Sequence, residues 1–341
     1  MESPSTNNRR RANLHSEAVM KTLTRSIGLL TACLMVAAGR TTLAQSGVRF
    51  HHVHLNSVNP AAAADYYTKA FTTSVKTTFN GEVAVKTVNG PYLLFTKVNT
   101  PPPTQPQSAI WHFGWNTPDS RAYLDRFHTM KLDVVPMYAD PENTVIEISS
   151  DALPNFPTTA KIRELRTQGV QPAKVGGFQY LRGPDGSLVE NAGNFPSEFF
   201  NHVHMFHEDP ACAQLWYTTH LGIAIGQGRG APITSENCKR PYEEVTWPAF
   251  DKIGMVRNPA GAVLVSDMAS ILIRPRHGPY VSPRGQIVDH FALSVPDLDA
   301  AIAKLKGEGV KVTEDIHRWG TMRAAMIEGP DLVAIELVEV K

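Results

Sequence analysis

Histidine recurs at matching places in the two halves of this sequence. The segments HHVHLNSVNPAAAADYYT (51–68) and NHVHMFHEDPACAQLWYT (201–218) align at a constant offset of 150, and both carry a His-Val-His triplet. From the first histidine of that triplet onward, eight of twenty aligned positions are identical. Neutral imidazoles and a carboxylate can together bind one side of a divalent metal and leave other positions open to a substrate. The repeat therefore indicates metal chemistry.

Further histidines and glutamates complete a candidate set in each half. HFGWNTPD (112–119) and HFALSVPD (290–297) both open with His-Phe and end with Pro-Asp. GPDGSLVE (183–190) and GPDLVAIE (329–336) both carry a glutamate into a final apolar strand, where a carboxylate is costly to bury without a cation. Taken in chain order, the candidate metal ligands are His52, His112 and Glu190 in the first half, and His202, His290 and Glu336 in the second. A solvent-facing strand end is the ordinary alternative for each glutamate.

A second histidine, His54 or His204, follows each first ligand candidate by two residues. Side chains two residues apart on a strand share a face, so both should point toward the candidate site. We expect them beside the metal, as acid–base groups or as partners that orient the ligands. Ligation of the metal and a structural hydrogen bond to a carbonyl are the alternatives. His51 should point to the opposite face, at the surface or a hinge.

The elements that must position these residues form four similar units. FHHVHLNSV (50–58) alternates apolar and β-branched residues with histidine, as a half-buried strand does. Asn59-Pro60 and Asp209-Pro210 predict helix starts, with a polar N-cap and proline in the first turn. Short apolar runs broken by glycine and asparagine, such as GEVAVKTVNGPYLLFTKV (81–98), predict antiparallel hairpins. The sequence therefore indicates four βαβββ modules, which begin near residues 50, 110, 200 and 288.

Length and composition are typical of a globular protein with two domains. The chain has 341 residues, of which 42% are hydrophobic and 19% are charged, and this length suits two domains of about 150 residues. We expect an α+β fold with an export signal at 1–44 and two domains at 48–197 and 198–341, each built from two consecutive modules. The net charge of +1 offers no basic face for nucleic acid.

The N-terminal segment has the pattern of an export signal. Basic residues precede the apolar run IGLLTACLMVAA (27–38), and small residues lie ahead of a cleavage site before Gln45. Because the run is too short for a comfortable membrane span, we expect a periplasmic or secreted protein with no stable span after cleavage. Lipoprotein anchoring through Cys33 is an alternative, which the apolar residues after Cys33 disfavour. Cys212 and Cys238 could form a disulfide outside the cell, although a buried free thiol at Cys212 is equally open.

These motifs resemble the vicinal oxygen chelate superfamily, which includes glyoxalase I, extradiol dioxygenases and proteins of fosfomycin or bleomycin resistance. The resemblance rests on His-Val-His-Leu, His-Phe-Ala-Leu, the Pro-Asp that follows, and Gly-Pro-Asp-x-x-x-x-Glu, and it covers nearly all of residues 48–341. It implies paired βαβββ modules that curl into two cupped mixed sheets around a divalent metal ion, such as Fe, Mn or Zn. It also implies that His52 and His202 lie on first strands, that His112 and His290 open the partner modules, and that Glu190 and Glu336 lie on last strands.

The resemblance limits the reaction only in part. Glyoxalase I-like sites add an acidic ligand at the end of the first module, but PYLLFTKV (91–98) and ASILIRP (269–275) offer no carboxylate. This difference favours the three-ligand set of extradiol dioxygenases and fosfomycin-resistance transferases. Tyr180 matches a dioxygenase tyrosine that contacts substrate oxygen. The histidine expected upstream of this tyrosine is missing, and Met326 stands at the tyrosine position in the second half. An ordinary strand aromatic is the alternative for Tyr180, and His317 is an acid–base candidate by position alone.

We therefore expect a metal-dependent enzyme that acts on a small substrate through two neighbouring oxygens, with dioxygenase-like or lyase/isomerase-like chemistry. One alternative is a binding protein of the bleomycin-resistance type, which sequesters a planar ligand without turnover. Another is a structural relative that binds no metal. One half could also serve as a scaffold while the other is active. The sequence leaves the substrate, the metal and the oligomeric state open.

Overall fold

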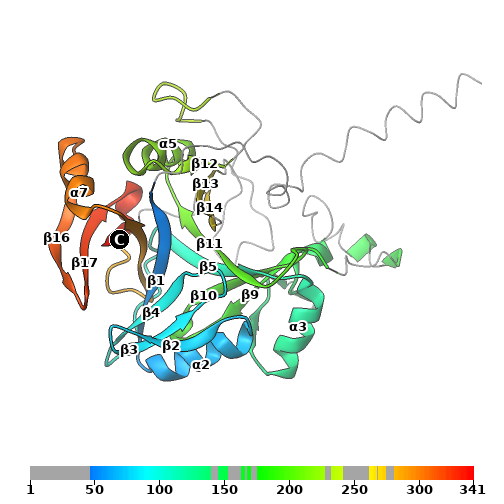
Figure 1. Cartoon of the computed structure of the whole chain (residues 1–341). Coiled ribbons are helices and arrows are strands. Elements are labelled where there is room, and N and C mark those ends of the chain that lie inside the picture. The colour runs from blue at the N-terminus through cyan, green and yellow to red at the C-terminus, as the bar shows by residue number, and fades with distance from the viewer. Residues whose placement is uncertain are drawn as a thin grey trace, which may run out of the picture. The chain divides into compact units, whose positions relative to one another are not determined.

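Two eight-stranded mixed sheets form the framework of the protein (Figure 1). The computed structural model describes residues 47–139, 145–152, 163–165, 167–169, 175–226, 232–240, 261–266, 268–273 and 280–341. The expected α+β class with two mixed sheets is confirmed. The proposed export signal at 1–44, with Cys33, lies outside the described residues.

Sheet I contains the first and fourth modules, in the strand order β16-β17-β18-β15-β1-β4-β3-β2. Its first module comprises β1 (Arg49–Ser57), α2 (Pro60–Ala70), β2 (Val75–Phe79), β3 (Glu82–Lys86) and β4 (Tyr92–Lys97). Its other module comprises β15 (Val288–Val295), α7 (Leu298–Gly307), β16 (Val312–Trp319), β17 (Met322–Glu328), the turn η3 (Pro330–Leu332) and β18 (Ala334–Glu339). The central pair, β1 and β15, is antiparallel, whereas β1 is parallel to β4 and β15 is parallel to β18.

Sheet II contains the second and third modules, in the strand order β12-β13-β14-β11-β5-β10-β9-β6. The second module comprises β5 (Ile110–Asn116), α3 (Ser120–Thr129), β6 (Asp133–Val135), β9 (Phe178–Arg182), η2 (Pro184–Gly186) and β10 (Leu188–Ala192). A small extra hairpin of β7 (Tyr138–Ala139) and β8 (Val145–Ile146), followed by η1 (Ser149–Ala152), lies between β6 and β9. The third module comprises β11 (Phe199–Phe206), α5 (Pro210–Leu221), β12 (Ala224–Ile225), β13 (Gly261–Val265) and β14 (Met268–Ile273).

The modules pair first with fourth and second with third, so the expectation that consecutive modules share a sheet is wrong. The connections explain this order. Residues 193–198 join β10 to β11 by a short loop, which keeps the second and third modules adjacent. Two longer connections follow β4 and precede β15, and their described parts lie beside each other at a bridge between Ser108 and Val281. Each sheet therefore draws on both halves of the sequence.

Each central strand carries an irregularity just before a histidine. Between Phe50 and His52 the strand β1 advances two residues while β15 advances one, from Leu293 to Ala292. Residue 51 is thus an inserted bulge residue, and β11 repeats the insertion at residue 201. The bulge places Phe50 on the same face as Val53, which is buried in the core, while His52 lies on the opposite face.

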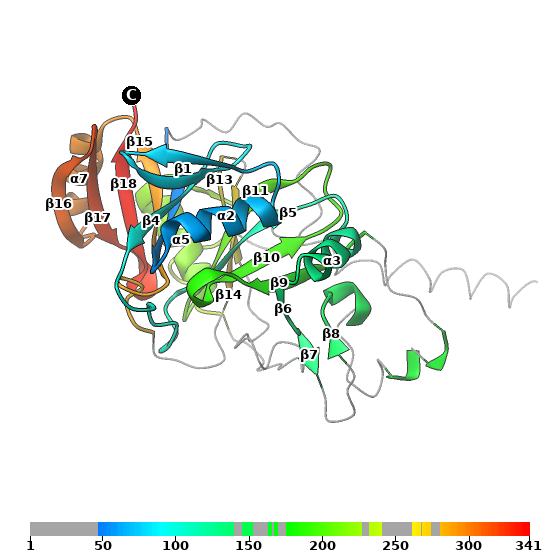
Figure 2. The ribbon, with the colours of Figure 1, turned by 90° about the horizontal axis from the view of Figure 1, so that it is seen from below.

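Aromatic side chains fill the core that joins the two sheets. Phe71, the C-cap residue of α2, stacks on Trp115 of β5 with ring centroids 4.1 Å apart, and both side chains are fully buried. Phe50 of β1 packs against Phe200 of β11 at 6.1 Å. Helix α2 also contacts β2, β3 and β4, so one helix bridges the sheets (Figure 2). The helix begins at Pro60 as predicted, with the Asn59 side chain accepting a hydrogen bond from the backbone N–H of Ala62.

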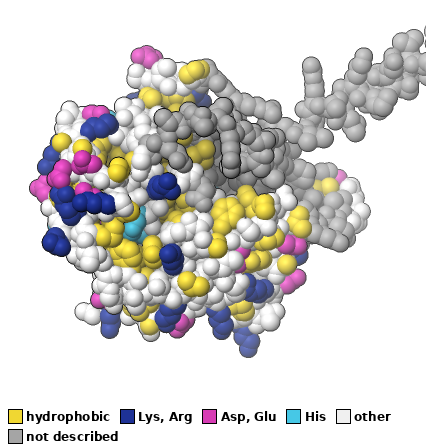
Figure 3. Space-filling view, viewed as in Figure 1, with side chains coloured by type: hydrophobic (Ala, Val, Ile, Leu, Met, Phe, Trp, Pro, Cys, Tyr) yellow, Lys and Arg dark blue, Asp and Glu magenta, His cyan; other side chains and the backbone are white. Residues whose placement is uncertain are grey.

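The described part of the chain contains one disulfide, between Cys212 of α5 and Cys238. The structure thus decides between the two alternatives that the sequence left open for these cysteines. On the face shown in Figure 3, a histidine patch lies among hydrophobic side chains, and charged side chains of both signs are interspersed around it. Among the described helices, none has the length and apolar composition needed to cross a membrane.

Candidate metal centres

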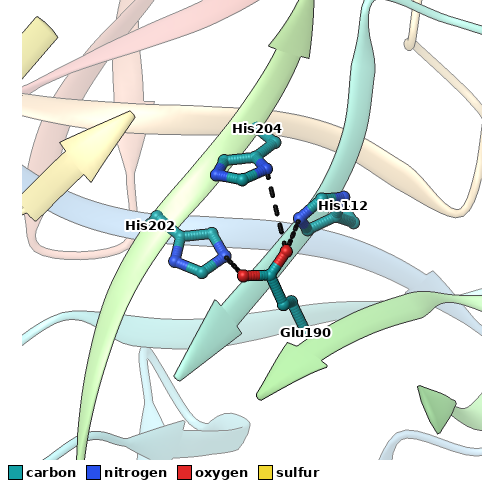
Figure 4. A group of neighbouring side chains, drawn as sticks. All are labelled: His112, Glu190, His202 and His204. Atoms are coloured by element: carbon teal, nitrogen blue, oxygen red, sulfur yellow. Dashed lines mark ion pairs between the residues drawn. The ribbon is translucent and has the colours of Figure 1, made fainter. Parts of the chain in front are cut away.

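Site II is a buried cluster of three histidines and one glutamate on sheet II (Figure 4). Its members are His112 of β5, Glu190 of β10, and His202 and His204 of β11. The Glu190 carboxylate lies 3.1 Å from His112 Nε2, 3.7 Å from His202 Nε2 and 3.9 Å from His204 Nδ1. One donor atom from each residue lies within 4.8 Å of the others.

The strand register explains how site II fits into a close-packed sheet. Gly114 stands between His202 and Glu190 on the neighbouring strands, and a Cβ there would lie 2.5 Å from His202 Nε2. The missing side chain therefore leaves room for the His202 ring. His204 stands directly opposite His112. Sheet I has the same arrangement, with Ala292 between His52 and Glu336.

Site I contains His52 and His54 of β1, His290 of β15 and Glu336 of β18. Glu336 Oε2 lies 3.3 Å from His52 Nε2 and 3.7 Å from His290 Nε2. The His54 ring stacks on His290 with centroids 4.6 Å apart. His54 is half-buried, whereas the other three residues are buried, so site I is most accessible at His54.

The edges of sheet I meet beside site I. Trp319 at the end of β16 packs 5.2 Å from Phe79 of β2 and 5.3 Å from His52, measured between ring centroids. The Asn80 side chain donates a hydrogen bond to the Trp319 carbonyl at 3.2 Å. Sheet I is therefore curled around the face that carries His52.

Burial keeps most of these imidazoles neutral, which is the form that binds a metal. It lowers the pKa of His52, His112 and His204 well below the usual value. Burial also lowers the pKa of His54 to about 3 and that of His202 to about 4. Burial opposes charging of His290 too, but the carboxylates of Asp289 and Glu336 outweigh it and raise the His290 pKa. Burial raises the pKa of Glu190, against the influence of His202 and of the hydrogen bond from Tyr180.

The polar atoms of both sites fit a divalent cation. In site I, His52 Nε2, His54 Nδ1, His290 Nε2 and Glu336 Oε2 are buried without a hydrogen-bond partner in the described part of the chain. In site II the same holds, among the described residues, for both ring nitrogens of His112 and for His202 Nε2. Leaving such atoms unpaired costs about 1–3 kcal/mol each. A bound metal would satisfy several of them at once, and nitrogen with carboxylate oxygen suits Fe, Mn or Zn.

The structure brings all six predicted ligands into the two clusters but changes their grouping. His52 was expected with His112 and Glu190, and it lies instead with His290 and Glu336. His202 was expected with His290 and Glu336, and it lies instead with His112 and Glu190. The reason is the pairing of modules across the two halves. That these residues bind a metal stays a prediction.

The remaining candidates have distinct surroundings. Tyr180 is buried opposite Glu190 on the neighbouring strand and hydrogen-bonds to it, while Met326 stands opposite Glu336. His317 is exposed on β16, with Nδ1 3.0 Å from the carbonyl oxygen of Asp315, and belongs to neither cluster.

His51 corrects the sequence expectation, because it does not point away from the site. Its Nδ1 lies 2.8 Å from Nδ1 of His52, since the bulge turns both rings to one side. Sequence reasoning also missed Gly114 and Ala292. The small residue two positions after each His-Phe histidine was the available signal for them.

Comparisons with known proteins agree with this architecture. Residues 199–337 match the model of the Glyoxalase/Bleomycin resistance protein/Dioxygenase superfamily. This match covers less than half of the chain, and it assigns residues 199–337 to the vicinal oxygen chelate superfamily. No curated protein matches this chain by sequence.

Solved structures extend the likeness to most of the chain. Glyoxalase I from Zea mays has a TM-score of 0.52 and 13% identity, covering 86% of this chain and 92% of its own. A mutant of the same enzyme has a TM-score of 0.51 and 11% identity, covering 86% of this chain and 94% of its own. At this level of identity, the likeness establishes the fold.

Proposed function

We propose that this protein is a metal-dependent enzyme of the vicinal oxygen chelate superfamily, acting on a small substrate that presents two neighbouring oxygens. The chemistry is dioxygenase-like or lyase/isomerase-like. One observation carries the proposal. In each sheet, two imidazoles and one carboxylate from three adjacent strands converge, with buried ligand atoms that find no hydrogen-bond partner among the described residues.

The chain's own residues have separable tasks. His52, His290 and Glu336 would hold a metal at site I, and His112, His202 and Glu190 would hold one at site II. A bound metal would supply a Lewis acid for the paired oxygens of the substrate. The surrounding aromatic rings, Trp319 in site I and Trp111 in site II, would restrict the access of water.

His54 is suited to proton transfer at site I. Its Nε2 lies 2.7 Å from the Thr96 hydroxyl, so its buried Nδ1 faces the cluster. With Thr96 accepting from Nε2–H, Nδ1 keeps a lone pair placed to accept the proton of a substrate hydroxyl, although burial, which lowers the His54 pKa to about 3, makes it a weak base. His204 has the corresponding position in site II, where its Nδ1 lies 3.9 Å from Glu190.

We also propose that the mature protein is exported. The proposed leader at 1–44 motivates this proposal, and the Cys212–Cys238 disulfide supports it, because disulfides persist mainly in oxidising compartments.

The first test is the metal content of the mature chain from Gln45 onward, purified without a chelator or a histidine tag. We expect about two metal equivalents per chain, since each site offers the three protein ligands typical of catalytic centres. Glu336→Gln should remove the metal of site I, and Glu190→Gln that of site II, because an amide is a much weaker ligand. Glu328→Gln, at the ion pair with Lys311 at 2.9 Å, is the matched control and should retain both metals.

Two outcomes would count against the enzyme proposal. Absence of metal after reloading with Fe(II), Mn(II) and Zn(II) would contradict it and favour a ligand-sequestering protein. Retention of both metals in the two glutamate variants would show that the metals bind elsewhere.

A further inference from the structure

The residue ahead of each predicted ligand histidine is a bulge residue, so its side chain can reach the histidine that follows. The insertions fall at residues 51 and 201, just before the His-Val-His triplets of β1 and β11, and at residues 111 and 289 on the partner strands β5 and β15. In a regular strand, neighbouring side chains point to opposite faces. An inserted residue breaks this alternation and can aim a side chain at its neighbour.

Asp289 uses this position to bind His290. Its Oδ1 lies 2.6 Å from His290 Nδ1 and also accepts a hydrogen bond from Arg284. Its Oδ2 accepts from the backbone N–H of Gly285 at 2.6 Å and from the Asn56 side chain at 3.3 Å. Three donors besides His290 therefore hold the Asp289 carboxylate in place, and Asp289 is buried.

These contacts determine which His290 nitrogen carries the proton. A bare Nδ1 would place its lone pair against a carboxylate oxygen at 2.6 Å, which is repulsive. Arg284 Nη1 also lies 3.0 Å from His290 Nδ1, and it can only donate, so it favours the opposite tautomer. Glu336 Oε2 lies 3.7 Å from His290 Nε2, so the contact of Nδ1 to Asp289 is the shorter one and should take the proton, and Nε2 keeps its lone pair.

The other histidines have weaker partners. In site II, Asn201 Oδ1 lies 3.1 Å from His202 Nδ1 and is a neutral acceptor. His112 follows Trp111, whose indole can only donate. In addition, Tyr180 hydrogen-bonds to Glu190, whereas Met326 stands opposite Glu336. A carboxylate that accepts a hydrogen bond from a ligand histidine makes the ligating nitrogen more basic. A hydrogen-bond donor to a ligand carboxylate makes that carboxylate less basic.

We infer that Asp289 is a positioning residue that fixes His290 with Nε2 free, and that site I therefore binds a divalent metal more tightly than site II. The role of Asp289 concerns the protein without metal. The ranking of the two metal affinities rests on the proposed function.

The role of Asp289 is tested by the His290 tautomer in the metal-free protein, measured by long-range ¹H–¹⁵N correlation at a pH above the raised His290 pKa, where the ring is neutral. We expect Nδ1–H in the wild type, a shift toward Nε2–H in Asp289→Ala, and Nδ1–H in Asp289→Asn, whose amide oxygen can still accept. Glu314→Gln is the control, because Glu314 binds the far side of Arg284 at 2.8 Å. It should leave the tautomer unchanged. Nε2–H in the wild type would overturn the inference even if Asp289→Ala does not fold.

The ranking of the two metal affinities is tested by chelator competition with Co(II) and Zn(II). We expect two unequal affinities, with the tighter one lost in Glu336→Gln and weakened about 10–100-fold in Asp289→Ala. In Glu190→Gln the tighter affinity should persist. Equal affinities, or loss of the tighter one in Glu190→Gln, would refute the ranking. If the wild type binds neither metal, the proposed function fails, whereas the tautomer measurement still decides the role of Asp289.

Discussion

At the scale of single residues, the two sites depend on what stands beside the histidines as much as on the histidines themselves. Gly114 leaves space for the His202 ring, and the bulge residues 51, 201 and 289 reach the Nδ1 atoms of the histidines that follow. Such neighbours set the orientation of a ligand ring and the nitrogen that it offers. Substitutions at these positions should therefore alter metal binding without changing any ligand.

Gly114→Ala should disrupt site II selectively. The added Cβ would lie 2.5 Å from His202 Nε2 and 2.7 Å from the Glu190 carbonyl oxygen, so the ring or the strand must move. Overpacking of this kind costs about 1–3 kcal/mol of stability. We expect metal content to fall from two equivalents to one.

The matched control is Ala292→Gly, which only removes a methyl group at the corresponding place in site I and should preserve both metals. Elemental analysis and denaturant unfolding check both variants. A Gly114→Ala protein with full metal content would show that the His202 ring does not need this space.

At the scale of elements, one helix connects the two sheets. Tyr67 of α2 and its C-cap residue Phe71 reach sheet II, where Phe71 stacks on Trp115 and the Tyr67 hydroxyl lies 2.8 Å from that of Ser187. The same helix packs on the strands of sheet I. Its burial depends on both sheets, so we expect unfolding of the sheets to be coupled.

Phe71→Ala should destabilise the protein by about 3–5 kcal/mol, because it removes a fully buried ring and leaves a cavity beside Trp115. Val75→Ala, at a side chain that is 55% exposed on the same module, should change stability by less than about 0.5 kcal/mol. Urea unfolding followed by tryptophan fluorescence and by far-UV circular dichroism measures both effects. A small loss in Phe71→Ala, or separate transitions for the two sheets, would contradict the coupling.

At the scale of the whole molecule, each sheet needs both halves of the sequence. The β1–β15 pair joins the first module to the fourth, and the β5–β11 pair joins the second to the third. A break between residues 197 and 198 would cut only a short connection but leave each half with unpaired central strands. Unpaired strands of this length tend to aggregate.

We therefore expect fragments 45–197 and 198–341 to be insoluble or poorly folded when each is produced alone. Produced together, they should form a 1:1 complex that contains both sites. Size-exclusion chromatography, circular dichroism and metal analysis test this expectation. If the first fragment folds alone and binds metal through His52, His112 and Glu190, consecutive modules pair after all and this expectation is wrong.

The sequence by itself determined the modules and the chemistry, because both are local. Residue alternation, Asn-Pro and Asp-Pro helix starts and a repeat offset by 150 positions identified the strands, the helices and all six ligand candidates. The tertiary structure decided which candidates share a site. Partner choice depends on the lengths and paths of the connections and on packing between distant strands, which no local pattern encodes. The inserted bulge residues do not follow the two-residue alternation of side chains along a strand. Only the strand register therefore shows that His51 and Asp289 turn toward the sites.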